Sequence, residues 1–447
     1  MRISVVSLGL VALVVHAAPL PAQFSSARGM GMGGVSLSRD GTLTRYNAAY
    51  RAVLNRPGQP GAPKLTVPLP LGLFHFFRDH PISQFKYDPL FHPDSARFNP
   101  VELINLILNP PFNYPLKQPP TPTNDIAFGV GKDSLQIILG NAQTLIPAGP
   151  FGFTGSSRLF DLNVSVKGAR IGVMTWLQDK VTFELGDSLI SVLKDGNPVT
   201  HQTDYTMTQQ SLAQAGFAPA LGWAGRVYGD SARGFYVGAN AHYYFGVAYG
   251  QASSTGGFTT SDTIFGSNPL ALNAVNQVSY SGWGNSLGHG IGVDLGAVWV
   301  SGPIEFGVGV NDIGATLTWG DTRTDFQHYD TASSQIVTDS SYLHQETKTK
   351  LPVLYIANLA YTTGSTTLGL NLINGGNGTK LRVGAEQRFG LFVVRGGVGR
   401  DERKKLQFGG GAGIRFGPMQ LDVGIATHSN SLSDERGVTL ATSLSIY

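Results

Sequence analysis

The sequence predicts an all-β fold, a transmembrane antiparallel β-barrel of about 14 strands. Three observations lead to this prediction. Apolar and polar residues alternate along one segment after another in the C-terminal part of the chain, and the connections between these segments are alternately tight and long. Beyond the N-terminal leader, no stretch approaches the roughly 20 continuous apolar residues of a membrane-spanning helix.

The alternation is clearest from residue 380 onward. Leu381, Val383 and Ala385 share one parity, whereas Lys380 and Arg382 share the other. Because successive side chains of a strand point to opposite faces, each such segment has one apolar and one polar face. The apolar faces need a large apolar surface opposite them, which is either a second sheet in a soluble sandwich or the lipid around a barrel.

Strand length and connections favour the barrel. A strand of about ten residues at about 3.3 Å each, tilted by about 40°, spans an apolar band of about 25 Å. The joints Phe389-Gly390 and Gly417-Pro418 are tight, whereas residues 400–405 and 429–436 form longer, charged connections. Short turns on one rim and long loops on the other are typical of outer-membrane barrels, while a sandwich more often has Greek-key crossovers.

The composition argues against several classes of protein. The net charge of +3 is too small, and the basic residues are too scattered, for nucleic-acid binding. The chain has no cysteine, so it forms no disulfide and carries no cysteine-linked lipid. Any attachment to a membrane must therefore come from the fold itself.

Residues 1–22 have the form of a secretory signal peptide. Arg2 precedes an apolar run over residues 5–15, and Ala22 supplies a small residue at the expected cleavage point. The alternative is an N-terminal membrane anchor, but the run is too short to span a bilayer. Cleavage predicts export, and together with the strand pattern it predicts localisation in the bacterial outer membrane.

Three segments follow this leader. Residues 23–56 are glycine-rich, which suits a backbone pressed into a confined space. Residues 57–125 are rich in proline and predict an irregular connection, because proline cannot donate to a β-ladder. Within them Asn99-Pro100 opens a short apolar helix, which is either a buried packing helix or an interfacial or lumen-blocking one. Residues 126–447 are predicted to form the barrel.

Strands dominate this barrel segment. In one of them, a long series of alternate apolar residues lies on the face opposite Asn240 and His242. These residues are Phe235, Val237, Ala239, Ala241, Tyr243, Phe245, Val247 and Tyr249. Long polar segments at residues 251–280 and 312–350 separate the strands, and parts of the second are expected to extend strands beyond the membrane. An even number of strands places both ends of the barrel on the periplasmic side.

No constellation of residues has the form of a catalytic or cofactor site, so the sequence predicts neither an enzyme nor a cofactor. His75, His80 and His92 lie near aspartates, but their spacing is irregular for a metal site. Four polar residues supply the residue types of a hydrolase, although ordinary lumen-facing positions explain them better. These four are His242, Asp294, Glu305 and His428.

The polar faces of the last strands are crowded with charge. The residues predicted to line the lumen are Lys380, Arg382, Glu386, Arg388, Arg395, Arg415 and Asp422. Because buried charge is costly unless it is paired or hydrated, these side chains either form a salt-bridged network that fills the lumen or line a wet channel. A role in orienting a ligand is the functional alternative.

The glycine-rich segment reads Ala27-Arg28-Gly29-Met30-Gly31-Met32-Gly33-Gly34-Val35 and is followed by Asp40, Asn47 and Ala48. This pattern resembles the N-terminal hatch of the FadL-like long-chain fatty-acid transporters and their TodX and PorV-type relatives. Residues 309–314, leading to Trp319, also resemble a PorV-type element. The resemblance implies a fourteen-stranded barrel that is plugged by its N-terminal segment, with the plug shaped by Gly31, Gly33, Gly34 and Asn47. It also implies that hydrophobic solutes bind a pocket and leave sideways into the membrane without ATP.

The leading expectation is therefore passive uptake of hydrophobic small molecules, of the fatty-acid or hydrocarbon type, across the outer membrane. A PorV-like barrel that does not transport, but serves as scaffold or anchor for a secretion or surface complex, is the alternative. A soluble secreted sandwich is the third. The expected partners are outer-membrane lipid, a hydrophobic ligand and the barrel-assembly machinery, whose clients end in an aromatic residue that Tyr447 resembles; nucleic acid is not expected.

Overall fold

The computed structural model describes residues 27–37, 43–53, 65–69, 81, 83, 112–115, 127–130, 135–139, 146, 148–262, 270–281, 287–333, 335–375, 378–400, 406–427 and 437–447. The predicted leader and the short apolar helix lie outside these residues. So do His75, His80, His92 and His428. In the parts of the chain that the structure describes, no helix is both long enough and apolar enough to cross a membrane.

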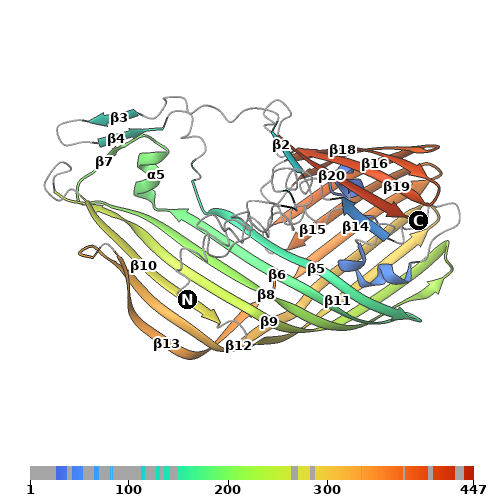
Figure 1. Cartoon of the computed structure of the whole chain (residues 1–447), viewed down its shortest axis with the longest axis horizontal. Helices are drawn as coiled ribbons and strands as arrows, with labels where there is room; N and C mark the ends of the chain where they lie inside the picture. Colours follow the sequence, from blue (N-terminus) through green and yellow to red (C-terminus); the bar gives the residue numbers. More distant parts are fainter. Residues whose placement is uncertain are drawn as a thin grey trace.

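A 17-stranded antiparallel sheet forms the wall of the molecule (Figure 1). Its strands pair with their neighbours along the chain in an up-and-down order. In this order the wall strands are β5 (Phe151–Val166), β6 (Ala169–Leu185), β8 (Asp204–Gly229), β9 (Arg233–Thr260), β11 (Gly288–Ser301), β12 (Ile304–Asp330), β14 (Leu354–Thr363), β15 (Thr366–Gly375), β16 (Thr379–Phe389), β17 (Phe392–Arg400), β18 (Leu406–Phe416), β19 (Met419–Thr427) and β20 (Gly437–Ile446).

Four further strands complete the sheet. β10 (Leu270–Ser281) pairs with β9 and β12, the two neighbours of β11, so it shares a position with β11. β13 (Gln335–Lys350) pairs with β12 beyond the end of the β12–β14 ladder and shares the position of β14. β1 (Leu65–Leu69) and β2 (Phe112–Pro115) pair with successive parts of the other edge of β20. In the described residues the wall therefore has fourteen positions, in agreement with the prediction of about 14 strands; the described ladders do not join β5 to β1 or β2.

Tight turns lie along one rim of the wall, which we call the short-turn rim. They follow β5, β11, β14, β16 and β18, and each contains a glycine with positive φ, where other residues are strained. These glycines are Gly168, Gly302, Gly364, Gly390 and Gly417. The C-terminus lies on the same rim, because the Tyr447 amide donates to the Pro418 carbonyl at 2.7 Å.

The polarity of the wall is the reverse of that of a soluble protein, because its inner face is polar and its outer face is apolar. Polar side chains such as Glu305, Asn358 and Asp422 face inward and are about 1% exposed, whereas large apolar residues of the opposite parity are exposed. The exposed set includes Phe306, Val308, Leu359, Leu368, Leu372, Leu381, Val383, Val394, Leu421, Val423 and Ile425. A soluble sandwich would bury this apolar face against a second sheet, so the structure supports the barrel over the sandwich.

The described part of the N-terminal region lies inside the wall (Figure 1, blue). We call residues 27–37 and 43–53 the plug; they contain the helix α2 (Ala27–Gly31) and the 3-10 helices η3 (Leu43–Arg45) and η4 (Ala48–Ala52). α2 contacts β17, β18, β19 and β20, whereas η4 contacts β8, β9 and β11. A segment this short touches strands so far apart in the sheet because the wall curves around it.

Several details differ from the sequence-based expectation. The proline-rich segment was expected to be irregular, yet β1 and β2 within it pair with β20. Alternation predicts that Tyr249 lies on the apolar outer face, but it is buried inside, because a β-bulge opposite Ala215 and Gly216 shifts the register of β9 there. Residues 251–280 were expected to be a connection, whereas β9 continues through them to Thr260 and β10 begins at Leu270.

Three strands are much longer than a membrane requires. β8, β9 and β12 have 26, 28 and 27 residues, against the about 9–11 that cross a bilayer. With β10 and β13 they form a sheet that projects from the end of the wall opposite the short-turn rim. The helix α5 (Asp187–Leu193) and a 3-stranded sheet of β3 (Ala127–Val130), β4 (Leu135–Ile138) and β7 (Pro198–Val199) lie at that end (Figure 1). Strand extension within residues 312–350 was expected; α5 was not.

Candidate functional site: a plugged lumen and a groove in the wall

The plug rests on glycines of the wall that lie in register across four strands. Gly369 of β15 pairs with Gly384 of β16, Gly384 with Gly397 of β17, and Gly397 with Gly409 of β18. A Cβ on Gly397 would lie 2.7 Å from the Gly33 nitrogen, and one on Gly369 would lie 2.6 Å from the Val35 side chain. This first glycine ladder lets the backbone of the plug lie directly against the wall.

The glycines predicted to shape the plug lie at this contact. A Cβ on Gly31 would lie 3.0 Å from the Gly411 Cα, and one on Gly33 would lie 2.6 Å from the Val398 nitrogen. Gly33 and Gly34 both have positive φ, at 68° and 86°, so each is fixed by conformation as well as by space. The plug and the wall therefore pack closely because both carry glycines, which have no side chain, at the contact.

A second glycine ladder lies beneath η4. Gly238 of β9 pairs with Gly296 of β11, which pairs with Gly309 of β12. A Cβ on Gly238 would lie 2.6 Å from the Ala49 nitrogen, and one on Gly309 would lie 2.6 Å from the Tyr46 carbonyl oxygen.

Asn47 joins η4 to the wall at this second ladder. Its Oδ1 accepts a hydrogen bond from the Ala49 amide at 3.0 Å, which caps the helix. Its Nδ2 donates to the carbonyl oxygens of Ala297 and Val308, at 3.1 and 2.9 Å. The side chain is fully buried, so Asn47 is a structural anchor of the plug.

Charged side chains of the plug and the last strands form a network around Glu386. Arg28 of the plug donates to both carboxylate oxygens, at 2.8 and 3.0 Å. Arg395 Nε donates to Glu386 Oε2 at 2.8 Å, and Arg388 Nε donates to Oε1 at 3.1 Å. Arg395 also binds Asp422, at 2.8 Å. We call these five residues the Glu386 network; it is a salt-bridged cluster that ties the plug to the wall.

The other predicted lumen residues lie outside this network. Arg382 donates to the Gly34 carbonyl at 2.9 Å and so holds the plug directly. Lys380 is half-buried near the start of β16, away from the short-turn rim. Arg415 lies at the short-turn rim with its guanidinium 4.6 Å from the centre of the Tyr447 ring.

A second ionic cluster, the Asp294 network, was not predicted as a unit. Arg158 of β5 donates to Asp294 of β11 at 2.8 and 2.9 Å and to Asp312 of β12 at 2.8 Å. The His242 Nε2 lies 2.6 Å from Asp294 Oδ2, and the Tyr244 hydroxyl donates to Asp312. The sequence alone predicts only that His242 and Asp294 are ordinary lumen-facing residues. Arg158 gave no signal in the sequence, because its partners lie 136 and 154 residues away.

An apolar cluster fills the interior farther from the short-turn rim. We call it the Trp319 cluster; it comprises Met174, Trp176, Ala218, Tyr244, Tyr249, Ala315, Leu317, Trp319 and Leu351. The rings of Tyr249 and Trp319 stack with their centroids 5.2 Å apart, and the indole nitrogen donates to Thr349 at 3.0 Å. An apolar cluster of this size is unexpected inside a barrel whose inner parity is otherwise polar.

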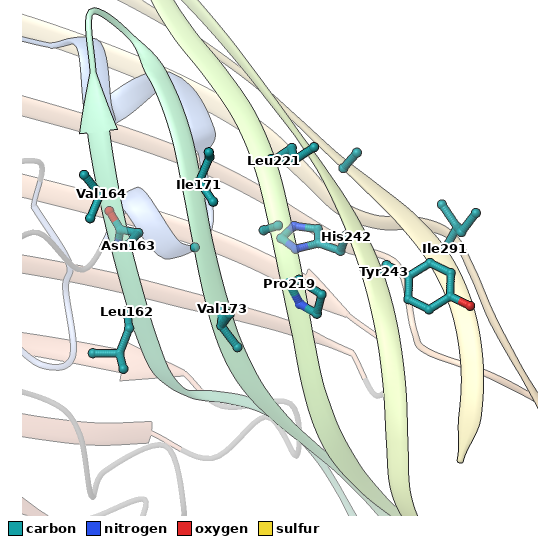
Figure 2. A pocket seen from close by; sticks show the side chains of 13 residues that line it. Leu162, Asn163, Val164, Ile171, Val173, Pro219, Leu221, His242, Tyr243 and Ile291 are labelled. Carbon is teal, nitrogen blue, oxygen red and sulfur yellow. The ribbon is translucent and has the colours of Figure 1, made fainter. Parts of the chain in front are cut away.

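A groove with a volume of 740 Å³ lies in the outer face of the wall over β5, β6, β8, β9 and β11 (Figure 2). We call it the wall groove. Its sides are outward apolar residues, and small residues form much of the rest of the lining. The lining consists of Leu162, Asn163, Val164, Ile171, Gly172, Val173, Pro219, Ala220, Leu221, Ala241, His242, Tyr243 and Ile291.

Pro219 weakens the wall at this groove. The β8–β9 ladder pairs Phe217 with Phe245 and Ala220 with His242, but no pair is formed at Ala218 and Pro219. The β6–β8 ladder is intact at Pro219, so the missing N–H of the proline faces β9. Met174, Ala218 and Tyr244 of the Trp319 cluster are chain neighbours of Val173, Pro219 and Tyr243 in the groove. The inner apolar cluster and the outer groove therefore lie back to back across one layer of weakened wall.

Within the described parts of the chain, no group of three or more histidine, aspartate or glutamate side chains is arranged to hold a metal ion.

No family model and no curated protein match the chain. Among solved structures it is similar to the toluene transporter TodX of Pseudomonas putida, with 10% identity, TM-score 0.31, and coverage of 74% of this chain and 99% of that one. It is also similar to the CymD monoaromatic hydrocarbon channel, with 13% identity, TM-score 0.32, and coverage of 69% and 91%. A mutant porin of Rh. blastica shows 11% identity, TM-score 0.23, and coverage of 62% and 99%. At such low values these likenesses carry no argument about the function of this chain.

Proposed function

We propose that this chain is an outer-membrane barrel for the passive uptake of hydrophobic small molecules. The observation that carries the proposal is the pairing of the wall groove with the Trp319 cluster behind it. An apolar solute that reaches the cluster has an apolar surface on the inner side of β8 and another on the outer side. Between them the β8–β9 ladder has no residue pairs at Ala218 and Pro219.

The apolar outer surface of the wall has the height and the aromatic residues expected of a barrel that spans a membrane. Phe235 and Phe245 are outward residues of β9, ten positions apart, which corresponds to a height of about 25 Å at 3.3 Å per residue and about 40° of tilt. Exposed aromatic residues gather near the short-turn rim, where they match an interfacial belt. They are Trp223, Tyr228, Phe235, Trp299, Phe306, Tyr361, Phe389, Phe392 and Phe416.

Sideways release into lipid explains how a plugged barrel passes a solute. The plug and the two ionic networks lie inside the wall, so a straight path through the barrel meets buried salt bridges. A path through the wall groove crosses apolar side chains instead. Transfer of an apolar solute from water to lipid is itself favourable, at about 25 cal/mol per Å² of surface, so no coupling to an energy source is required.

Uptake into proteoliposomes tests the proposal. Vesicles that contain the purified chain should take up labelled decanoate or toluene faster than vesicles without protein. A labelled disaccharide, which is polar, should enter both at the same rate. Equal uptake of the apolar solutes by the two kinds of vesicle would reject the proposal.

A second candidate is a scaffold or anchor for a secretion or surface complex. It is favoured by the sheet that β8, β9, β10, β12 and β13 extend beyond the membrane, since nearly all of β13 is exposed. A variant in which residues 320–346 are replaced by a tight turn removes the end of this sheet. If the chain is a scaffold, stoichiometric partners that co-purify with the full chain should be lost from this variant, while uptake should stay unchanged.

A further inference from the structure

His242 carries a buried ring nitrogen that the described residues leave unpaired. The side chain is 1% exposed, and its Nε2 lies 2.6 Å from Asp294 Oδ2. Its Nδ1 has no hydrogen-bond partner among the described residues. A buried polar atom without a partner is destabilising, and in a native structure it points to a ligand, a water or a function.

The Asp294 network fixes the orientation of this imidazole. Arg158 donates to both oxygens of Asp294, and the Asp312 amide donates to Oδ1 at 3.0 Å, so the carboxylate is held as an acceptor. The Nε2 must therefore carry a proton and donate it to Asp294. In the neutral ring this leaves Nδ1 with a free lone pair, and in the charged ring it leaves Nδ1 with a free N–H.

His242 also belongs to the lining of the wall groove, beside Pro219 and Leu221 (Figure 2). The neighbouring lining residues Ala220 and Ala241 are small. Ala220 pairs with His242, and the β8–β9 ladder is interrupted next to this pair, at Ala218 and Pro219. The groove volume of 740 Å³ falls in the range of small-molecule sites. His242 has the inward parity of β9, so its ring lies on the lumen side of the wall. The groove thus supplies a large apolar surface, and one unsatisfied polar atom lies behind it, next to the gap in the β8–β9 ladder.

We propose that the wall groove and His242 form a binding subsite for apolar compounds that carry a hydroxyl group, such as long-chain alcohols. The inference rests on the proposed function and names the class of solute that it favours. The apolar body lies against Leu162, Ile171 and Leu221, and the hydroxyl pairs with His242 Nδ1 as β8 and β9 part at Pro219.

The hydroxyl follows from the chemistry of the site. A hydroxyl both donates and accepts, so it satisfies Nδ1 whether or not that nitrogen is protonated. A hydrocarbon leaves Nδ1 unsatisfied. A carboxylate suffers repulsion from Asp294 and Asp312, which already share Arg158. The subsite therefore ranks an alcohol above a hydrocarbon and a carboxylate of the same chain length.

Equilibrium binding to the detergent-purified full chain tests this ranking. The probes are tritiated 1-decanol, decane and decanoate, each corrected for its uptake by protein-free micelles. One net hydrogen bond makes decanol bind about three- to tenfold more tightly than decane. Equal corrected affinities for decanol and decane would overturn the inference, whereas binding of none of the three would overturn the proposed function as well.

Two variants locate the effect. His242→Phe keeps a ring in place but removes the nitrogen, and it should abolish the preference for decanol while decane binding is retained. His289→Phe is the matched control, because it makes the same substitution at an exposed position of β11 outside the groove; it should keep the preference. A preference for decanol that survives in His242→Phe would show that a group other than His242 binds the hydroxyl, and would contradict the inference. The wild-type ranking needs no variant and so stands even if His242→Phe does not fold.

Discussion

Arg28 and Glu386 face each other from the plug and the wall, joined by two hydrogen bonds of 2.8 and 3.0 Å between buried side chains. They are 358 residues apart in the chain. A paired guanidinium and carboxylate in this geometry gives both strength and direction to the contact. The position of the plug is therefore set by specific chemistry as well as by the shape of the wall.

Arg28→Gln should loosen the plug and lower the free energy of unfolding by about 1–3 kcal/mol, because a charged partner of a buried carboxylate is lost. The loss of stability should be smaller than for a carboxylate left without any charged partner, since Arg388 and Arg395 still bind Glu386. Urea unfolding of the refolded barrel measures it. Lys348→Gln is the control, because Lys348 and Glu346 form an exposed pair whose loss should change stability by less than about 1 kcal/mol. Equal effects of the two variants would contradict the anchoring role.

Gly397→Ala should displace the plug, because the added Cβ would lie 2.7 Å from the Gly33 nitrogen. We expect a cost of about 1–3 kcal/mol, as for overpacking in a core, and faster proteolysis of the N-terminal segment. Gly396→Ala is a closely matched control, since a Cβ on this adjacent residue meets nothing within 4 Å. If both variants behave alike, the first glycine ladder does not seat the plug.

Asn47→Asp separates the two roles of Asn47. The carboxylate still accepts from the Ala49 amide, but it cannot donate to the carbonyls of Ala297 and Val308. The variant should therefore lose about 2–3 kcal/mol, because a buried charge faces two unsatisfied carbonyl oxygens. Thermal unfolding measures the loss. A variant as stable as the original chain would mean that the contacts with the wall contribute nothing.

These three tests concern features of which only some could be predicted from the sequence. Alternation was enough to place Glu386, Arg395 and Asp422 on the inner parity, because it depends only on the local geometry of a strand. The glycine ladders were not visible, since they depend on the register between strands and on which wall residues the plug meets. Arg158 was missed for the same reason: its contact with Asp294 exists only because the wall curls.

Local irregularities account for the remaining differences. Tyr249 was assigned to the wrong face because one β-bulge reverses the parity of the strand. Pro68 argued against a strand over residues 65–69, yet β1 lies on the edge of β20, where a missing donor is tolerated. Pro219 lies within β8, where the same reasoning identifies a real gap in the ladder.

Pro219→Ala should close that gap and slow uptake through the wall. The alanine supplies the missing N–H to β9, so the wall should gain about 0.5–1.5 kcal/mol of stability. Initial rates of decanoate or toluene uptake into proteoliposomes should fall, while the barrel stays folded. Pro418→Ala changes a proline in a tight turn at the short-turn rim and should leave the rate unchanged. A Pro219→Ala variant that transports at the original rate would exclude this part of the wall as the route.

The account as a whole depends on lipid covering the apolar face of the wall. The chain has no cysteine, so single cysteines can be labelled without background. Leu381→Cys places a fluorophore on the outer face, and Lys380→Cys places one at the adjacent, half-buried position of the inner face. In vesicles with brominated acyl chains, we expect strong quenching at position 381 and little at position 380. Equal quenching at the two positions, or stronger quenching at 380, would contradict the account.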